Sequence, residues 1–105
     1  MEKLQSTEQF MKLANTENVI FMFTADWCPD CRVIDPIMPE IEKKFSDYAF
    51  VSVDRDEFID LCIEKDIYGI PSFLGFREGQ EQGRFVSRDR KTQEEIESFI
   101  SSLSK

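Results

Sequence analysis

The sequence predicts a single α/β domain in which helices cover both faces of a central mixed sheet of four to five strands. Continuous apolar runs rich in β-branched and aromatic residues indicate strands buried on both faces, as parallel pairing requires. These runs alternate with segments whose apolar residues recur at helical spacing. The chain has 105 residues, of which 41% are hydrophobic, so we expect one domain over residues 1–105.

The first half of the chain is expected to form a helix, a strand, a helix and a strand in that order. Ser6 followed three residues later by Gln9 is a capping-box pattern, which begins the first helix. The run 19–23 is the first strand, and residues 48–54 form the second. Between them we expect a helix over residues 29–45, bent or broken because its two prolines remove backbone donors. Its inner face is expected to carry Val33, Ile34, Ile37, Ile41 and Phe45.

The second half is expected to add a short helix, an antiparallel hairpin and a final helix. Strand, helix and strand in succession imply that the first two strands pair in parallel. Residues 71–76 and 83–86 are strand-like, and the polar, glycine-containing segment 77–82 joins them as a hairpin loop. Thr92 is expected to cap the last helix. The inner faces would carry Phe58, Leu61, Cys62 and Ile63 in the short helix and Ile96, Phe99, Ile100 and Leu103 in the last.

Charge and hydropathy exclude several classes of partner. The chain has 21 acidic and 13 basic side chains, and its net charge of −8 repels phosphate backbones and anionic lipid surfaces. We therefore expect neither a nucleic-acid nor a membrane partner. Nothing near the N-terminus resembles a signal peptide, and no apolar run approaches transmembrane length. We expect a cytoplasmic protein and a monomer, and in a reducing compartment a close cysteine pair is more often redox-active than structural.

Residues 24–32, TADWCPDCR, place two cysteines where the first strand gives way to a helix. If Cys28 is the N-cap, Pro29 takes the first helical position, where its missing N–H has no cost. The spacing of three puts Cys28 and Cys31 on one helical face, within the narrow range of separations that a disulfide needs. Only a thiolate attacks a disulfide, and the N-H groups at a helix N-terminus favour one at Cys28. The motif therefore predicts a reversible dithiol couple.

Asp30 stands between the two cysteines and has two alternative roles. Its negative charge disfavours a nearby thiolate, and a weakly stabilised thiolate is typical of a reducing couple rather than a strong oxidant. The carboxylate is equally suited to shuttle a proton for Cys31. Both roles remain open at this stage.

Other interpretations of these residues are weaker. The chain has no histidine and only Cys62 beyond the pair, so a zinc site with four Cys or His ligands cannot be assembled, and we expect no metal and no cofactor. An inert disulfide within the motif would close a tiny loop and constrain the unfolded chain little. For Trp27 the alternative to a functional role is a position in the core. For Pro71 the alternative is a proline that simply begins a strand. Cys62 lies among apolar residues at helical spacing, which favours a buried, inert thiol over a regulatory one.

The sequence Trp27-Cys28-Pro29-Asp30-Cys31 after an apolar strand, with Gly69-Ile70-Pro71 about forty residues later, resembles the thioredoxin family across nearly the whole chain. The resemblance implies a thioredoxin fold and a thiol-disulfide oxidoreductase that reduces disulfides in protein substrates. It implies that Cys28 is the nucleophile and Cys31 the resolving thiol. It further implies that the Pro71 peptide bond is cis, that the Ile70 backbone pairs with the substrate, and that Trp27 and Pro29 line the docking surface.

The same resemblance suggests thioredoxin reductase as the electron donor. The alternative function is a redox-dependent binding module that uses the same surface to dock a partner with little turnover.

The chain departs from the family pattern at three places that bear on mechanism. Met22 stands where the family buries an aspartate beneath the cysteines, and Phe50 stands where a lysine accompanies it, so we expect a wholly apolar core below the site. Without that carboxylate, deprotonation of Cys31 falls to Asp30 or water, and resolution should be slower. The segment 87–91 is longer and more charged than in the family, which we expect to alter partner choice. The family's kinking proline is matched by Pro36.

Overall fold

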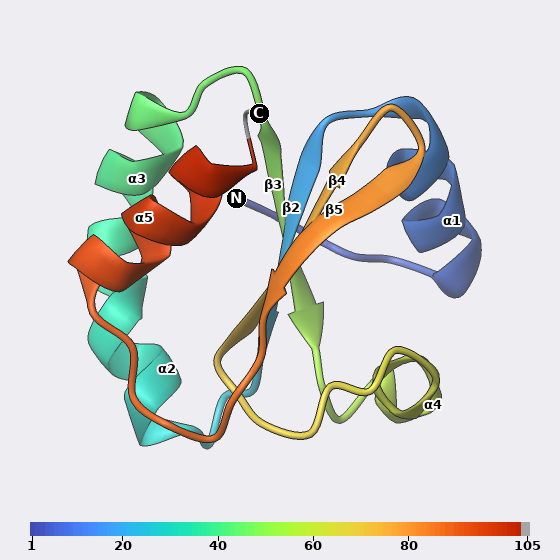
Figure 1. The fold of residues 1–105 in the computed structure, drawn as a ribbon. Coiled ribbons are helices and arrows are strands. Elements are labelled where there is room, and N and C mark those ends of the chain that lie inside the picture. The colour runs from blue at the N-terminus through green and yellow to red at the C-terminus, as the bar shows by residue number, and fades with distance from the viewer. Residues whose placement is uncertain (104–105) are drawn as a thin grey trace.

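Strand β2 (Val19–Thr24) occupies the centre of a five-stranded mixed sheet whose order is β1-β3-β2-β4-β5. It pairs in parallel with β3 on one side and antiparallel with β4 on the other, and β4 and β5 form an antiparallel hairpin. The expected α/β fold with a mixed sheet is confirmed. This computed structural model describes residues 1–103, so the end of the expected domain, at residue 105, lies outside the described part of the chain (Figure 1).

The remaining elements have the following bounds. The other strands are β1 (Glu2–Lys3), β3 (Ala49–Asp54), β4 (Ser72–Arg77) and β5 (Gln80–Phe85). The helices are α1 (Thr7–Thr16), α2 (Pro29–Ile34), the 3-10 helix η1 (Asp35–Ile37), α3 (Met38–Lys44), α4 (Ile59–Glu64) and α5 (Gln93–Ser102). Among the described residues, no helix combines the length and apolar character needed to cross a membrane.

Helices form a layer on each side of the sheet, α1 and α4 on one face and α2, α3 and α5 on the other (Figure 1). Because side chains alternate along a strand, β2 supplies both cores. Phe21 and Phe23 enter the core on the α1 and α4 side, where Phe21 packs against Phe10 with ring centroids 4.2 Å apart. Ile20 and Met22 enter the core beneath α2, α3 and α5. Burial on both faces explains the unbroken apolar run in the sequence.

Caps fix where the first and last helices begin. The Ser6 hydroxyl accepts the Gln9 N-H at 3.0 Å and starts α1. Thr92 and Glu95 form a complete capping box at α5, in which each side chain bonds the other residue's backbone N-H. Both starts agree with the sequence patterns, because capping depends on neighbours only three residues away.

The predictions for two inner-face residues, Val33 and Ile63, are wrong. Val33 is 52% exposed because α2 turns Cys31 and Ile34, three residues apart, toward the core, and Val33 lies off that face. Ile63 is 68% exposed because α4 turns only Leu61 and Cys62 fully inward.

The predicted hairpin loop 77–82 is also too long. Strand β5 begins at Gln80, and the turn is formed by Glu78 and Gly79, which both have positive φ. The local pairing of Arg77 with Gln80 closes this two-residue connection. The sequence patterns do not predict strand β1. It spans two residues, and its position depends on pairing with β3 rather than on its own composition.

Two substitutions on α4 separate buried from exposed apolar positions. We expect Leu61→Ala to lower the free energy of unfolding by about 2 to 5 kcal/mol, because Leu61 is buried between α4 and the sheet. The matched change Ile63→Ala on the exposed side of the same helix is expected to alter it by less than about 0.5 kcal/mol. Urea unfolding measures both values. Equal losses would contradict the orientation of α4.

Candidate active site

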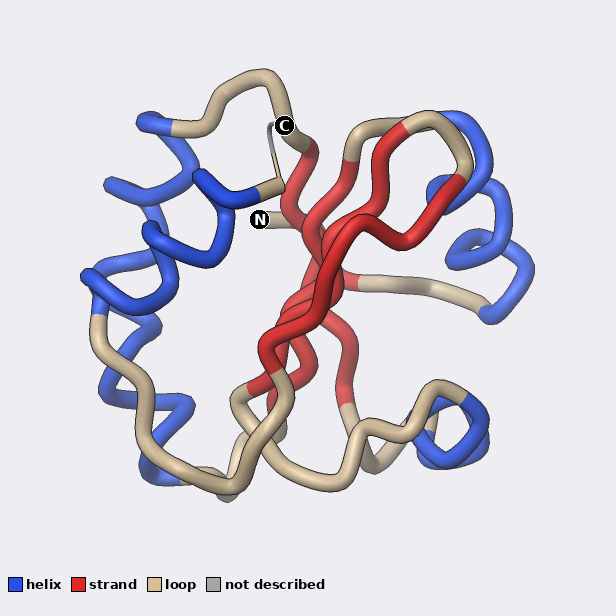
Figure 2. Tube along the Cα trace, in the orientation of Figure 1, coloured by secondary structure: helices blue, strands red, loops and turns tan. Residues whose placement is uncertain are grey.

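Four connections meet at one end of the sheet and together form the site (Figure 2). They follow β2, β3, α4 and β5, and Figure 2 shows them as loops gathered at a common edge. Contacts between segments far apart in the sequence join them. The Trp27 indole N-H donates to Asp56 at 2.7 Å, and Arg90 donates to Asp30 at 3.0 Å. The end of the parallel pair β2 and β3 thus carries the chemistry, as is usual for α/β sheets.

The two cysteines lie at the start of α2 as the sequence predicts. Cys28 is the N-cap, and Pro29 stands in the first turn. The Cys28 sulfur accepts the backbone N-H of Cys31 at 3.2 Å, so the first turn of the helix directs a donor at this atom. The same sulfur lies 4.0 Å from the carbonyl oxygen of Ile70. Both cysteines are free thiols in the structure, and both are buried.

Burial makes Cys31 the harder thiol to ionise. It raises the pKa of Cys31 to about 11, and a side-chain hydrogen bond with Cys28 adds to this effect. Cys31 is fully buried, whereas Cys28 is 4% exposed. Cys28 is therefore slightly the more accessible of the two thiols.

A cis peptide bond joins Ile70 to Pro71 beside the cysteines, as the resemblance implied. Ile70 packs against the small cluster of Ala25 and the two cysteines. The Ser72 hydroxyl donates to the Gly69 carbonyl and closes the turn around the proline. A Cβ atom at Gly69 would overlap the Ser87 carbonyl, so this glycine lets the connection after β5 approach closely.

Trp27 forms an exposed ridge next to the cysteines. It is 59% exposed, which rules out the core alternative considered for it. Its indole is held by the bond to Asp56, and the Arg55 guanidinium lies 5.7 Å from the ring centroid. Pro29 is also exposed and extends this surface.

The connection after β5 runs across the start of α2, and we call residues 87–91 the strap. Its Arg90 bonds the Asp30 carboxylate through Nε, which joins residues sixty positions apart. The sequence shows that this segment is charged, but no local pattern identifies Asp30 as the partner. Arg90 is therefore a site residue that sequence reasoning missed.

The apolar core below the site has a buried cation as its neighbour. Met22 and Phe50 are both buried in one apolar cluster, as predicted. Lys91, however, is only 2% exposed. Its ammonium lies 5.1 Å from the Phe85 ring centroid, and burial lowers the pKa of Lys91. A buried cation in the strap thus accompanies the absence of a buried carboxylate at Met22.

The family model described as Thioredoxin matches residues 1–102 of the chain. This match agrees with the cysteine motif at the N-terminus of α2 and with the neighbouring cis-proline. The chain belongs to the thioredoxin family. It is a thiol-disulfide oxidoreductase of the protein-disulfide class.

Individual relatives agree with this match. A thioredoxin H-type from Fagopyrum esculentum is 42% identical over 80 residues, which cover 75% of this chain and 69% of that protein. Thioredoxin from Oryctolagus cuniculus is 28% identical over 103 residues, covering 98% of this chain and 95% of the relative. The crystal structure of thioredoxin from Trypanosoma brucei brucei superposes with a TM-score of 0.84 at 22% identity, covering 96% and 88% of the two chains, and supports the thioredoxin fold.

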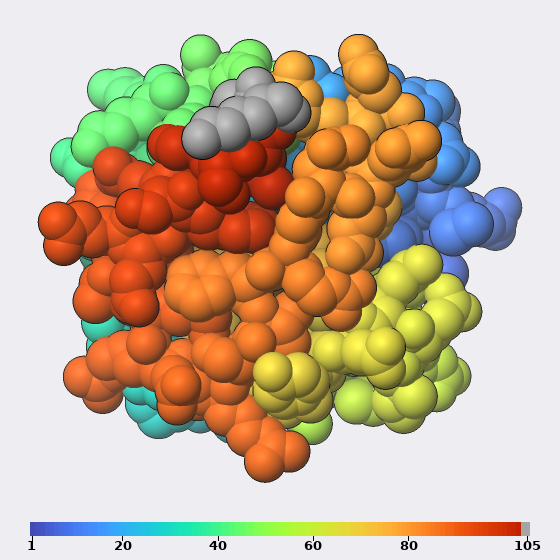
Figure 3. All heavy atoms as spheres, viewed as in Figure 1, coloured from blue at the N-terminus to red at the C-terminus, as the bar shows by residue number. Residues whose placement is uncertain are grey.

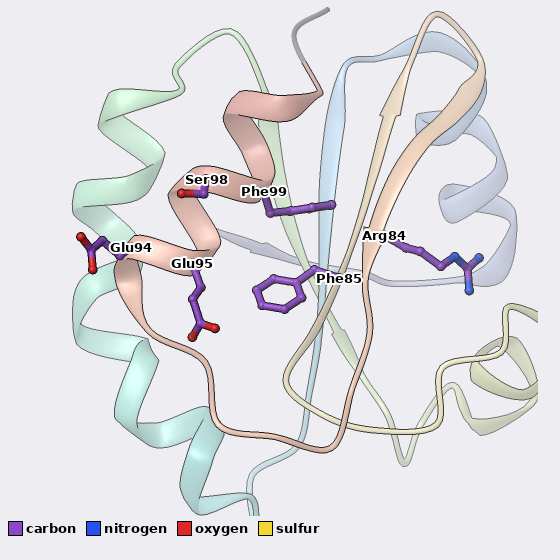
Figure 4. A pocket seen from close by; sticks show the side chains of 6 residues that line it. All are labelled: Arg84, Phe85, Glu94, Glu95, Ser98 and Phe99. Atoms are coloured by element: carbon purple, nitrogen blue, oxygen red, sulfur yellow. The ribbon is translucent and has the colours of Figure 1, made fainter.

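Other parts of the surface are separate from the thioredoxin motif. A hollow of about 540 Å³ between β5 and α5 is lined by the residues shown in Figure 4. In that view Phe85 and Phe99 form its wall, and Arg84 points away from it. Within residues 1–103, no group of three or more His, Cys, Asp or Glu side chains is placed to hold a metal ion.

The third thiol of this thioredoxin-family chain gives a pH-dependent stability. Burial raises the pKa of Cys62 from 9.0 to about 11, so the folded state keeps its proton at a pH where the unfolded chain loses it. The free energy of unfolding contributed by Cys62 is therefore fully present below about pH 9 and declines between about pH 9 and 11.

We expect Cys62→Ala to make the fall in stability over that window less steep, by up to about 1.4 kcal/mol per pH unit. Urea unfolding of the reduced protein from pH 7 to pH 10.5 measures the slope. The slope near pH 7 is the internal control and should not change. Identical slopes for both proteins above pH 9 would show that Cys62 ionises equally in both states.

Proposed function

We propose that the chain reduces disulfides in protein substrates through the Cys28 and Cys31 couple. The observation that carries this proposal is the position of the Cys28 sulfur. It accepts the Cys31 N-H at the start of α2 and lies beside the backbone of Ile70, next to the cis-proline. A sulfur placed between a hydrogen-bond donor and the backbone that precedes a cis-proline suits nucleophilic attack on a docked disulfide.

The reaction transfers two electrons in two exchange steps. The Cys28 thiolate attacks one sulfur of the substrate disulfide and releases the other as a thiolate, which takes up a proton. Cys31 then loses its proton and attacks the Cys28 sulfur. This step releases the second substrate thiol and leaves a Cys28–Cys31 disulfide. The substrate has been reduced and the couple oxidised, and we propose thioredoxin reductase as the donor that restores the dithiol.

The docking surface consists of Trp27, Pro29 and the turn at Ile70 and Pro71. The exposed indole of Trp27 offers a rigid apolar contact for residues that flank a substrate disulfide. Pro71 is itself buried, so its part is to present the Ile70 backbone rather than to touch the substrate broadly. An extended substrate segment can pair with that backbone, as a strand pairs with the edge of a sheet.

The second step is the demanding one for this chain. The pKa of Cys31 is raised to about 11, and Met22 offers no group to accept its proton. Asp30, the carboxylate within the motif, has two alternative roles. It accepts the Cys31 proton, directly or through water, or it tunes the reactivity of the Cys28 thiol. An Asp30→Asn variant separates the two, since only the shuttle role predicts a slower second step.

A second candidate function follows from the burial of Cys31, which slows the second step. A slow second step prolongs the mixed disulfide, and a long-lived mixed disulfide holds a partner instead of turning it over. The same surface would then serve as a redox-dependent binding module. The measured lifetime of the mixed disulfide distinguishes the two functions.

The cellular setting belongs to the proposal as well. We propose a cytoplasmic monomer, because the reducing conditions of the cytoplasm keep a dithiol couple in its reduced form. Its relatives include plant H-type thioredoxins and a mitochondrial thioredoxin of Schizosaccharomyces pombe. Fractionation of cells that express the chain tests the compartment, and light scattering tests the monomer.

Insulin reduction tests the proposed function directly. With thioredoxin reductase and NADPH present, we expect the wild-type chain to turn over insulin and Cys28→Ser to fall to the background rate, because no nucleophile remains. Cys31→Ser should form a stable mixed disulfide on Cys28, seen as a mass shift that dithiothreitol reverses. Cys62→Ala is the control and should keep the wild-type rate. Turnover that survives Cys28→Ser would reject the assignment of the nucleophile.

Met22→Asp tests whether the missing carboxylate limits the second step. We expect the lifetime of the mixed disulfide to shorten, since a buried acceptor for the Cys31 proton becomes available. We also expect the free energy of unfolding to fall by about 2 to 5 kcal/mol, because a carboxyl group enters an apolar core. Met22→Leu, which keeps the volume, should cost less than about 1.5 kcal/mol and leave the lifetime unchanged. Stopped-flow fluorescence measures the lifetime, and an unaltered value in Met22→Asp contradicts the explanation.

A further inference from the structure

The carboxylate inside the cysteine motif is paired with a cation from a distant segment. Asp30 lies in the first turn of α2, and its Oδ1 accepts from the Arg90 Nε at 3.0 Å. The Asp30 side chain is 30% exposed and that of Arg90 is 66% exposed. The pair therefore stands at the edge of the redox site, where solvent screens it only in part.

The strap is held from beneath by Lys91. The buried ammonium donates to the Ser87 carbonyl, the Ser87 hydroxyl and the Asp89 carbonyl at 3.0 to 3.3 Å. These three acceptors satisfy the three donors of the ammonium and close the strap around it. Because Lys91 is fixed inside the protein, the neighbouring Arg90 side chain starts from a defined position on the surface.

The other end of the strap is held against the turn that precedes Pro71. Ser87 packs directly on Gly69, where no side chain fits. Arg88 donates to the Tyr68 carbonyl at 3.3 Å, and its guanidinium lies 5.9 Å from the Tyr68 ring centroid. In the space-filling view the strap region (orange) meets the segment after α4 (yellow) at the lower edge of the molecule (Figure 3). The strap thus connects the cis-proline turn to the start of α2.

The charges around the Cys28 sulfur come from several elements. The ionisable groups on these elements include Asp26, Asp30, Cys31, Arg32 and Asp35 around α2, Arg55, Asp56 and Glu57 after β3, Arg88, Asp89, Arg90 and Lys91 in the strap, and Glu95 in α5. Asp56 pairs with Arg55, and Asp35 pairs with Arg32. Asp30 is the carboxylate between the cysteines, and its charge acts against a thiolate unless a cation offsets it.

We propose that Arg90 is a positioning residue of the redox site, whose ion pair with Asp30 offsets the carboxylate between the cysteines and keeps Cys28 reactive at neutral pH. Arg90 acts through Asp30 and does not itself touch the substrate. This inference rests on the proposed function, because it concerns the same nucleophile. It also gives the strap a role in the chemistry in addition to its expected role in partner choice.

The test is the pH profile of iodoacetamide alkylation of Cys28, followed by mass spectrometry on the full reduced chain. We expect Arg90→Gln to move the midpoint upward by about half a pH unit, which is a roughly threefold loss of rate at pH 7. Asp30→Asn should move it downward. In the Asp30→Asn background, Arg90→Gln should shift the midpoint by no more than about 0.2 pH units, because its partner is gone.

Two further variants separate charge from loop structure. Arg90→Lys keeps the cation and should keep the midpoint within about 0.2 pH units of wild type. Arg88→Gln is the matched control, because Arg88 lies in the same strap but contacts Tyr68 rather than Asp30. It should leave the midpoint unchanged, and thermal unfolding confirms that each variant is folded.

Three results would overturn the inference. They are an unmoved midpoint in Arg90→Gln, an equal shift with and without Asp30, and an equal shift in Arg88→Gln. Insulin reduction by the wild-type chain tests the proposed function separately. Wild-type turnover with an unmoved Arg90→Gln midpoint removes this inference alone, whereas thiols that do not cycle in the wild type remove the proposed function and this inference with it.

Discussion

The pairing of β2 on both sides is the constraint on which the site depends. Six consecutive residues of this strand are held in parallel register with β3 and five of them in antiparallel register with β4. Both of its faces are buried, so a shift of one residue would exchange the contents of the two cores. The strand therefore fixes where the chain leaves the sheet, and the cysteine motif follows within four residues. A rigid origin of this kind holds Cys28 where α2 begins and where β4 brings the cis-proline turn.

Electrostatics around the site follow from burial more than from net charge. The chain carries a net charge of −8, yet two buried groups near the motif have shifted pKa values: the pKa of the Cys31 thiol is raised and the pKa of Lys91 is lowered. Burial disfavours the charged form in each case, whatever its sign. The exposed rim is arranged differently, as ion pairs such as Arg90 with Asp30. The site thus combines an interior that resists ionisation with an edge where opposite charges balance.

Patterns within a few residues predicted much of this fold. The helix caps at Ser6 and Thr92, the buried strands β2 and β3 and the N-cap position of Cys28 all depend on neighbours within about four residues, and they are confirmed. The predictions for Val33 and Ile63 are wrong because periodicity shows that a residue is apolar but not how much of a short helix faces the core. The cis-proline was expected from the family resemblance, not from local pattern.

Long-range features of the site could not be predicted in this way. The bond between Asp30 and Arg90 spans sixty residues, and the burial of Lys91 depends on how the strap folds around its ammonium. Charge in the sequence usually indicates solvent exposure, so a buried lysine contradicts the ordinary expectation. Its only local signal is its position immediately before the cap Thr92.

The exposed Trp27 gives this protein a built-in optical probe. It is the chain's one tryptophan, and it sits next to the reactive cysteine with its ring edge tied to Asp56 and its face below Arg55. Light emitted by an indole changes with the polarity around it and is quenched by nearby sulfur and charge. The emission spectrum of the unmodified protein therefore follows the oxidation of the neighbouring sulfur and the arrival of a docked polypeptide in real time, with no dye attached.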